Sequence, residues 1–524
     1  MLIELLIFLV TSLLAYYVYV YKKIHWHYDN RGLKYIPGVP IFGNVLKSTF
    51  LRRHMFEDLD AVYKEFPDEK YVGFLEGVTP ILLIRNPDLI KSVTVKNFDH
   101  FMNHKKFFDE ETEPLFGGSL LMMDGERWRD MRMTLSPAFT GSKMRHMLPF
   151  MVEISNNLVE YLKDHQSEDM DVEDLIRRYT NDVIASAAYG LRVNSFKDKE
   201  NEFFVTGQNL FKFNWWQRFI FFVSIQFPAI GKVFGGSIFP KKTTEFFRDL
   251  VRNTMEYRRK NNIERPDMIQ LLMEASEGKL KNADTEENDS VGFATVNEEL
   301  KHHGHTREWT ENELIGQVFI FFVAGFESSA SALVMCVHEL AINPNIQETL
   351  YQEIREFKET KETLSYDNVS VLKYLDNVLN ETLRKWSPAV ILDRICNKEF
   401  ILPPPREGGD AYRVNPGDVV YNFVNSLHMD PKYFPDPEKF DPDRFLDENK
   451  HNIKPFTYMP FGMGPRNCIG SRFALLELKV LLYNLVLNYK ILKVEKTADP
   501  IKLKTDEFNL KSQGGSWVRF QARE

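Results

Sequence analysis

The stretch that decides the fold is a glycine-rich turn ahead of a helical run, and it reads Phe461-Gly462-Met463-Gly464-Pro465-Arg466-Asn467-Cys468-Ile469-Gly470. The glycines and the proline keep this backbone non-helical, so its N–H groups can point at the sulfur of Cys468. A helix start carries partial positive charge, which favours a thiolate, and Arg466 adds a nearby cation. A lone cysteine is more often a buried structural thiol. Here every defined position of the pattern F-x-x-G-x-R-x-C-x-G is filled, which indicates a functional sulfur.

The turn closely resembles the haem-binding loop of the cytochrome P450 family. The resemblance implies that Cys468 is the axial thiolate ligand of the iron of haem b, a ligand type that favours O–O cleavage. It also implies that Phe461, Arg466 and Gly470 are cofactor-binding residues.

Length and composition set the broad class. The 524 residues would suggest more than one domain, but the family-like motifs from Trp128 to Cys468 would converge on one haem, which predicts one large catalytic domain. A hydrophobic fraction of 44% and a charged fraction of 27% are ordinary for a folded chain. The net charge of −8 argues against a nucleic-acid binder. Three cysteines exclude a disulfide framework and predict a reducing compartment.

The N-terminus predicts a membrane anchor. Leu5 to Tyr21 carry no charge, and residues 1–21 are about long enough to cross a bilayer as a helix. The alternative is a cleaved signal peptide, which typically has a basic start and a small-residue cleavage site, whereas the first charged residue here is Glu4. Lys22 and Lys23 after the span predict a catalytic domain that faces the cytosol, on the endoplasmic reticulum membrane.

Three units follow from this prediction: an anchor over 1–21, a basic linker and proline-rich hinge over 22–44, and a catalytic domain over 45–524. Short apolar runs at 71–74 and 81–84 predict a small β-hairpin, with Asn86 starting a helix. The polar segment 276–305 predicts a flexible surface loop, and 508–519 a terminal hairpin.

The segment 203–240 is crowded with aromatic residues, namely Phe203, Phe204, Phe211, Phe213, Trp215, Trp216, Phe219, Phe221, Phe222, Phe227, Phe234 and Phe239. Some of these rings could pack in the hydrophobic core. So many rings between helices predict a substrate roof that dips into lipid. In the P450 family this region gives access to the substrate.

Trp128 and Arg132 are spaced i, i+4, so that an indole N–H and a guanidinium share one helical face. The family resemblance assigns both to a haem propionate, whereas the pattern alone could be a surface cation–π pair. The same stretch carries a local group of basic residues, Arg127, Arg129, Lys143 and Arg145. A solvated face is the plain interpretation of this group, and docking of an acidic redox partner is the alternative.

The run 309–339 predicts a long buried helix with an almost wholly apolar middle. Ala324 and Gly325 lack bulk, so a flat ligand could lie against them, and Glu327 and Ser328 place an acid and a hydroxyl in an apolar setting. A capping or water-bonded pair within a core helix is the alternative. The segment resembles the family's oxygen-activating helix, which implies catalytic roles for Glu327 and Ser328, although the family usually carries threonine where Ser328 stands.

Glu381 and Arg384 form an i, i+3 pair that surface helices also carry by chance. The family resemblance joins Glu381, Arg384 and Arg444 in a buried network beside the haem. It also implies that Arg394 binds a propionate.

These motifs occur in family order and predict a mainly α fold with small β-sheets, with haem between the 309–339 helix and the helix after Cys468. The implied function is haem-thiolate monooxygenation of lipophilic small molecules, either foreign compounds or hormones. The sequence resembles the insect branch of the family. The implied partners are the membrane, an NADPH–cytochrome P450 reductase and, as a further candidate, a microsomal b-type cytochrome. Two alternatives remain: a haem-thiolate sensor of gas or ligand, and a peroxide isomerase that needs no reductase. Glu327 and Ser328 favour catalysis over sensing.

Overall fold

The computed structural model describes residues 2–39, 41–108, 110–166, 168–227, 230–231, 237–276, 291–295, 309–360 and 362–524. Its helices are α1 Leu2–Asp29, α2 Leu46–Thr49, α3 Met55–Glu65, α4 Pro87–Lys91, α5 Pro114–Gly117, α6 Gly125–Leu135, α7 Gly141–Lys163, α8 Val172–Tyr189, α9 Glu202–Asn209, α10 Trp215–Gln226, α12 Lys241–Asn261, α13 Met268–Ser276, α14 Glu311–Ile342, α15 Pro344–Glu359, α16 Lys373–Lys385, α17 Val424–His428 and α18 Ser471–Asn488. Its strands are β1 Tyr71–Glu76, β2 Thr79–Ile84, β3 Asp169–Asp171, β4 Ile391–Ile395, β5 Phe400–Leu402, β6 Tyr412–Val414, β7 Val419–Phe423, β8 Tyr489–Lys493 and β9 Trp517–Ala522. The predicted mainly α fold with small sheets is confirmed.

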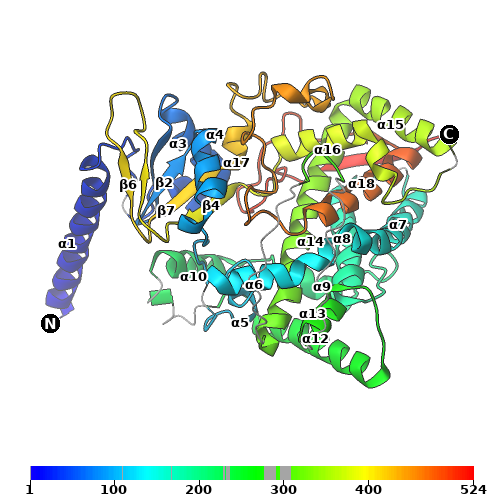
Figure 1. Ribbon diagram of the computed structural model, residues 1–524, viewed down its shortest axis with the longest axis horizontal. Coiled ribbons are helices and arrows are strands. Elements are labelled where there is room, and N and C mark those ends of the chain that lie inside the picture. Colours follow the sequence, from blue (N-terminus) through cyan, green and yellow to red (C-terminus); the bar gives the residue numbers. More distant parts are fainter. Residues whose placement is uncertain are drawn as a thin grey trace.

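Helix α14 is the axis of the helical part of the molecule (Figure 1). It starts with a capping box, in which the Glu313 N–H donates to Thr310 Oγ1 at 3.3 Å and the Thr310 N–H donates to Glu313 Oε2 at 2.8 Å. Most of its residues are buried, as the apolar run predicted, because α8, α16 and α18 pack around it. Its observed bounds lie within three residues of the predicted helix.

A mixed sheet lies on the other side of the molecule, with strand order β1-β2-β7-β4. The predicted hairpin is present as the antiparallel pair β1–β2, with Tyr71 opposite Ile84. Strand β7 adds to β2 in parallel, and β4 pairs antiparallel with β7. Asn86 caps α4 as predicted, because its side chain accepts from the N–H groups of Asp88 at 2.9 Å and Leu89 at 3.1 Å.

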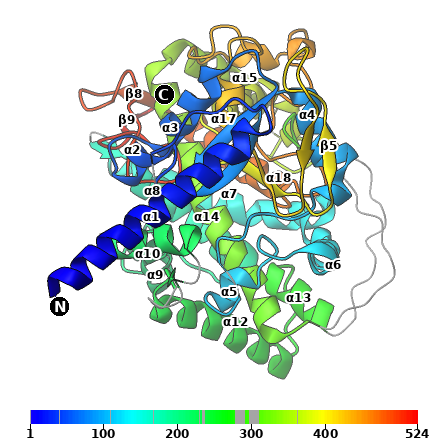
Figure 2. The ribbon, with the colours of Figure 1, turned by 90° about the vertical axis from the view of Figure 1, so that its left-hand side faces the viewer.

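Helix α1 extends away from the rest of the chain toward the N-terminus (Figures 1 and 2). Its first turns are exposed and apolar, but the helix continues to Asp29, eight residues beyond the predicted end of the anchor. The last turn docks on the sheet, where the Tyr28 hydroxyl donates to Phe74 O at 2.8 Å. The predicted hinge also docks, because Asn44 exchanges hydrogen bonds with Leu75 at 2.8 Å in both directions. Pro40 of this hinge lies outside the described residues.

The predicted terminal hairpin over 508–519 is wrong. Instead β9 starts at Trp517 and pairs with β8 and β3 in a second sheet, of order β3-β9-β8. Glycines 514 and 515 have φ of +86° and +92° and turn the chain into β9. Strand β8 follows α18 directly, so the partner of β9 lies upstream of the predicted hairpin.

Candidate active site

The Cys468 turn is closed by its own backbone. The Cys468 N–H donates to Phe461 O at 2.8 Å, and the Asn467 N–H donates to Gly464 O at 2.9 Å. Gly462 and Gly464 have φ of +74° and +77°, a region that favours glycine. At Gly464 a Cβ would lie 1.9 Å from Thr94 O, so close backbone approach also requires glycine there. Gly470 is the N-cap of α18.

The sulfur of Cys468 is exposed although both neighbours in its motif, Arg466 and Asn467, are buried. Enclosure by protein raises the pKa of the Cys468 thiol, while the Gly470 N–H and the charge of Arg132 act to lower it. The Gly470 N–H at the helix start thus lowers the pKa as expected, but desolvation outweighs it, and the net shift of the thiol pKa is upward. The helix begins three residues later, at Ser471, so its dipole acts from farther away.

Arg466 is a buried structural cation. Its guanidinium donates to the carbonyls of Met102 at 2.9 Å and Met123 at 2.7 Å, and it lies over the Trp128 ring at 4.1 Å. Burial and the charge of Arg394 lower the pKa of Arg466 to about 8. Arg466 thus ties the Cys468 turn to the chain before α6.

Arg394 is the second buried cation, on β4. Its Nη1 donates to Asp393 O at 2.7 Å, and its Nε is buried without a hydrogen-bond partner in the part of the chain that the structure describes. Burial lowers the pKa of Arg394 to about 10. The adjacent Asp393 is already engaged, because it accepts from Lys105 N at 2.5 Å and pairs with His104 Nδ1 at 2.9 Å.

Trp128 and Arg132 share one face of α6, as their spacing predicted. Trp128 is buried under Arg466, and Arg132 donates to Asn467 O at 2.8 Å and to Asn467 Oδ1 at 2.5 Å. Both side chains therefore contact the residues that precede Cys468.

On α14 the small residues divide between two faces. Ala324 is exposed and Ser328 is half-buried, one turn apart, and the Ser328 hydroxyl donates to Ala324 O at 2.5 Å. Gly325 serves a different purpose from the one expected, because a Cβ there would lie 2.6 Å from Ile184 Cδ1 on α8. The open face of the helix therefore consists of Ala324 and Ser328.

The apolar setting expected for Glu327 is wrong. Its carboxylate accepts from Arg177 Nη2 at 2.9 and 3.0 Å and forms a close ion pair with Lys511. Lys511 also pairs with Glu173 at 3.0 Å. Glu327 thus belongs to a mostly buried ion network that joins α14 to α8 and to the C-terminal segment.

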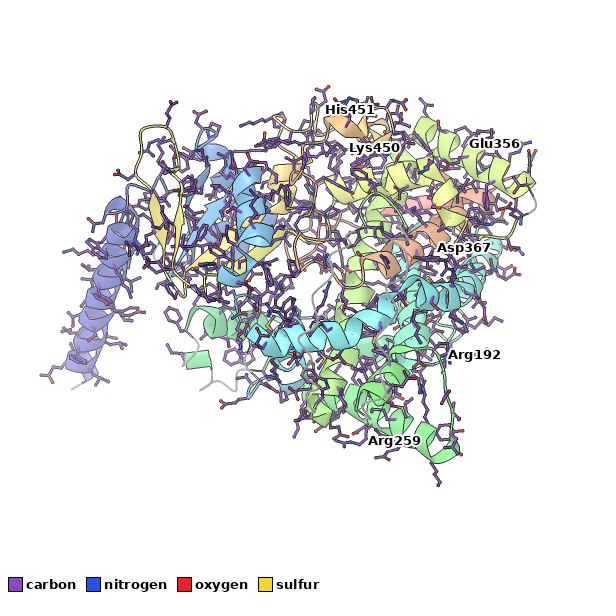
Figure 3. All side chains as sticks on the ribbon, viewed as in Figure 1. Arg192, Arg259, Glu356, Asp367, Lys450 and His451 are labelled. Atoms are coloured by element: carbon purple, nitrogen blue, oxygen red, sulfur yellow. The ribbon has the colours of Figure 1, made fainter. Side chains whose placement is uncertain are left out.

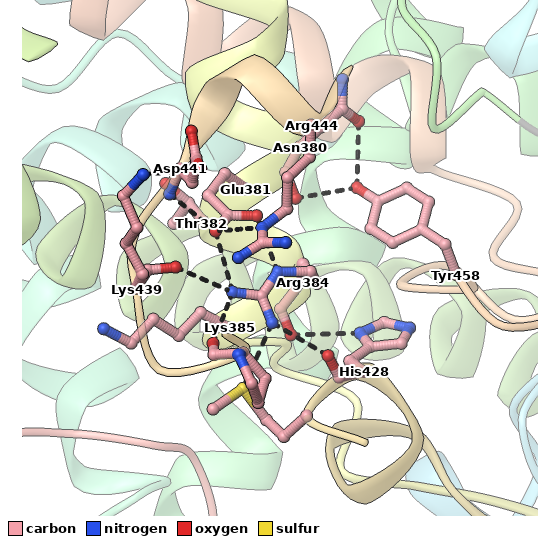
Figure 4. Close-up of polar contacts among 12 residues, drawn as sticks. Asn380, Glu381, Thr382, Arg384, Lys385, His428, Lys439, Asp441, Arg444 and Tyr458 are labelled. Carbon is pink, nitrogen blue, oxygen red and sulfur yellow. Dashed lines mark hydrogen bonds and ion pairs between the residues drawn. The ribbon is translucent and has the colours of Figure 1, made fainter. Parts of the chain in front are cut away.

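The predicted network of Glu381, Arg384 and Arg444 is present (Figure 4). Arg384 and Glu381 make a two-point contact at 2.7 and 2.8 Å with both side chains fully buried, and Arg444 Nε lies 3.5 Å from Glu381. Arg384 also donates to the carbonyls of His428 at 2.9 Å and Pro437 at 2.8 Å. The network therefore fixes α16 to the segment that leads into the Cys468 turn.

The basic group on α6 and α7 is largely neutralised. Arg127 pairs with Glu110 and Glu313 at 2.8 Å, and Arg145 pairs with Asp367 at 2.9 Å. Other charged side chains, such as Arg259, Glu356 and Lys450, lie at the periphery (Figure 3). Arg127 and Arg145 therefore do not support the docking of an acidic redox partner on this face.

These features fit a flat, anionic, iron-bearing group. The unpartnered Nε of Arg394 can donate to a carboxylate, and the exposed sulfur of Cys468 can bind a soft metal. The exposed side chain at position 324 of α14 is a small alanine, so a flat group can lie against the helix there. The residues present therefore fit haem b.

Several residues of the site were missed from the sequence. Arg177 and Lys511 partner Glu327, Asn467 partners Arg132, and His104 holds Asp393. The partners lie 150 to 335 positions apart in the sequence, and only Asp393, beside Arg394, carried a local signal.

The chain was compared with known proteins. A family model described as Cytochrome P450 matches residues 34–519. The chain is 41% identical over 95% of its length to "Probable cytochrome P450 9f2" of Drosophila melanogaster, and 40% identical over 98% to "Cytochrome P450 9e2" of Blattella germanica, covering 95% and 96% of those proteins. It is also 32% identical to "Cytochrome P450 6k1" of Blattella germanica over 98% of its length and 96% of that protein. Together with the cysteine turn and its buried arginines, these matches establish that the chain belongs to the cytochrome P450 family, as a haem b oxidoreductase of the monooxygenase class.

Proposed function

We propose that this cytochrome P450 oxidises lipophilic small molecules, either foreign compounds or endogenous hormones and lipids. Its electrons come from NADPH through NADPH–cytochrome P450 reductase, with a microsomal b-type cytochrome as a further candidate donor. The observation that carries the proposal is the exposed Cys468 sulfur in a turn fixed by Arg466.

In this proposal Cys468 would be the iron ligand, and Arg132, Arg394 and the neutral indole N–H of Trp128 would hold the propionates. Arg466 supports this site by fixing the Cys468 turn. Phe461 and Gly470 shape the turn. When bound, haem supplies O₂ activation and the transfer of one oxygen atom to the substrate. The chain supplies ligation, orientation and proton delivery.

Proton delivery falls to Ser328. Its hydroxyl is on the open face of α14, where it can donate once it leaves its bond to Ala324 O. Glu327 acts on Ser328 indirectly, because its carboxylate is held by Arg177 and Lys511 and fixes the helix beside the serine. Glu381, Arg384 and Arg444 fix α16 to the segment that leads into the Cys468 turn.

The lipophilic substrate class is supported by an aromatic cluster from separate segments. Phe108 lies 5.6 Å from Phe116 and 5.7 Å from Phe221, and Phe239 lies 5.8 Å from Phe319 of α14. Such rings favour apolar ligands. Phe203 and Phe204 belong to the same buried core as Phe108, Phe239 and Phe319, and Phe234 lies outside the described residues.

Membrane attachment is supported by two apolar surfaces. Residues such as Phe8 of α1 are 71% exposed, and α10 presents Trp215 at 75% exposure together with Trp216 and Phe219. We infer that residues 1–21 anchor the protein in the endoplasmic reticulum membrane, that 22–44 connect and dock, and that the catalytic domain of 45–524 faces the cytosol.

The function is tested by product analysis of the purified holoprotein with reductase, NADPH and a panel of lipophilic compounds. The expected result is one oxygen atom from labelled O₂ in the product, dependent on NADPH and reductase. Turnover of a peroxide without reductase, or ligand binding with no product across the panel, would favour the isomerase or the sensor instead. Retention in membranes after alkaline carbonate extraction tests the anchor, and release into the supernatant would contradict it.

A further inference from the structure

A short segment far along the chain from the Cys468 turn packs on its scaffold. The sequence predicted a flexible surface loop over 276–305, of which residues 277–290 and 296–305 lie outside the described part. Val291–Thr295 is described and is docked, with Val291 2% and Ala294 5% exposed. The preceding helix α13 lies at the opposite end of the helical part from α16, at the bottom of Figure 1.

The backbone of this segment completes a buried ion pair between α16 and α18. Lys479 Nζ lies 2.8 Å from Asp376 Oδ1 and donates to Val291 O at 2.6 Å, and the side chain of Lys479 is 1% exposed. The Phe293 N–H donates to Asp376 Oδ2 at 3.0 Å. A buried ammonium needs such partners, so this pair depends on the segment.

The fit of the segment is tight at Gly292. A Cβ at this position would lie 2.1 Å from Asp376 Oδ1 and 3.3 Å from Lys479 Nζ. The backbone can therefore approach the ion pair only with glycine here.

The ring of Phe293 packs on two residues of the Cys468 scaffold. It lies 5.6 Å from the Phe445 ring and 5.8 Å from the Tyr458 ring. Phe445 adjoins Arg444, and the Tyr458 hydroxyl donates to Asn380 Oδ1 at 2.9 Å, next to Glu381 (Figure 4). Asn380 in turn donates to Asp376 Oδ2 at 2.9 Å. The segment therefore contacts the buried network from two sides.

We propose that the segment 291–295 is an intramolecular clamp that positions the scaffold of the Cys468 turn by joining α16 and α18 to Phe445 and Tyr458. Release of the clamp lets the sulfur detach from iron while the helices stay folded. This inference rests on the proposed ligation of haem iron by Cys468. The clamp residues are positioning residues, because none of them touches the cofactor.

The test follows the thiolate signature of the ferrous carbon monoxide complex, a red-shifted Soret band, at a temperature where far-UV circular dichroism is unchanged. Phe293→Ala removes the ring that packs on Phe445 and Tyr458, and Gly292→Ala pushes the backbone away from Asp376 and Lys479. Both variants are expected to lose the band about tenfold faster than the wild type, a factor that corresponds to about 1.4 kcal/mol. Phe293→Tyr keeps the ring and is expected to decay at the wild-type rate. Phe50→Ala is the matched control, because Phe50 is 58% exposed and its ring lies 5.2 Å from Phe42, away from this scaffold.

The outcomes separate the two proposals. A wild-type holoprotein without the red-shifted band overturns both the ligation and the clamp. A wild type with the band, and clamp variants that decay at its rate, overturns the clamp alone. Loss of the band in step with loss of helix content also overturns it, because the segment would then be part of the general stability.

Discussion

Ser328 and Glu327 are adjacent residues in different surroundings. Ser328 is half-buried on the open face of α14 with its hydroxyl on Ala324 O, whereas Glu327 is buried in an ion network with Arg177 and Lys511. Successive residues on a helix point about 100° apart, so neighbours in the sequence need not share an environment. The two residues therefore require separate tests.

Ser328→Ala removes the hydroxyl proposed to deliver protons. General acid assistance is worth roughly 10²–10⁴-fold in rate, so reducing equivalents should be diverted from product to peroxide. Ser328→Thr keeps the hydroxyl and restricts its rotamers, and should preserve or tighten coupling. The measurement is product formed per NADPH consumed with haem content matched, and equal coupling in wild type and Ser328→Ala would move this role to ordered water.

Glu327→Gln removes one of the two carboxylates that Arg177 and Lys511 share and leaves Glu173 as the other. Removing one partner of a buried ion pair costs about 3 kcal/mol, so the free energy of unfolding in urea should fall by about that amount. Lys511→Met added to Glu327→Gln should restore part of the loss, since the buried cluster then holds one cation fewer for the carboxylate that was removed. Additive losses in the double variant would show that the two residues do not interact.

At the residue scale the sequence was informative where a role depends on local spacing. Trp128 and Arg132 on α6, and Glu381 and Arg384 on α16, were found because i, i+4 and i, i+3 neighbours meet on a helix. The partners of Glu327 were not found, because the contact with Lys511 joins residues that are brought together only by the fold.

The Cys468 turn is the element in which backbone conformation matters most. Gly462 and Gly464 have nearly the same positive φ. A Cβ at Gly462 would make an ordinary contact, 3.7 Å from Asn467 Cα, whereas a Cβ at Gly464 would clash with backbone, 1.9 Å from Thr94 O. Gly462→Ala should therefore cost the strain of a left-handed alanine alone, about 1 kcal/mol, while Gly464→Ala must also displace the chain at Thr94. We expect haem retention to fall much further in Gly464→Ala, measured by gel filtration of the holoproteins. Equal haem loss would mean that backbone strain alone sets the effect.

Helix α18 carries a buried acid that should respond to pH. Burial raises the pKa of Glu477 from its ordinary value of 4.5 to about 8, an effect that the Ser329 hydroxyl only partly offsets. Between these values the unfolded chain releases the proton and the folded chain retains it. The contribution of Glu477 to stability is therefore greatest at low pH and falls as pH rises from 4.5 to about 8.

Glu477→Gln keeps the shape of the side chain and removes its titration. The difference in melting temperature between Glu477→Gln and the wild type should move in favour of the variant as pH rises from about 5 to 8. Glu356→Gln, at an exposed position, is the control and should show no such trend. A difference that stays constant with pH would contradict a raised pKa.

At the element scale the sequence predicted the hairpin β1–β2 and helix α14, because each has a local period and local caps. It could not predict β9 pairing with β8 and β3, or Val291–Thr295 docking on α16 and α18. These contacts join distant segments, and the second depends on Gly292 fitting against Asp376.

The whole molecule combines an exposed apolar helix, a small mixed sheet and a helical body around α14 (Figures 1 and 2). Fold class and family followed from motifs in order along the chain. The extent of α1 did not, because hydropathy ends near Tyr21 while the helix continues until Tyr28 packs on β1 and β2.

The central claim for the whole molecule is that its fold presents one sulfur, that of Cys468, as the ligand of the haem iron. The most direct test is the carbon monoxide difference spectrum of the reduced holoprotein in the wild type, Cys468→Ser, Cys336→Ser and Cys396→Ser. Cys336 and Cys396 are buried, with pKa values raised to about 12 and about 11, whereas Cys468 is exposed, so neither buried thiol is open to a metal. We expect the red-shifted Soret band of a thiolate haem in the wild type and both control variants, and its absence in Cys468→Ser. A red-shifted band that persists in Cys468→Ser would contradict the account.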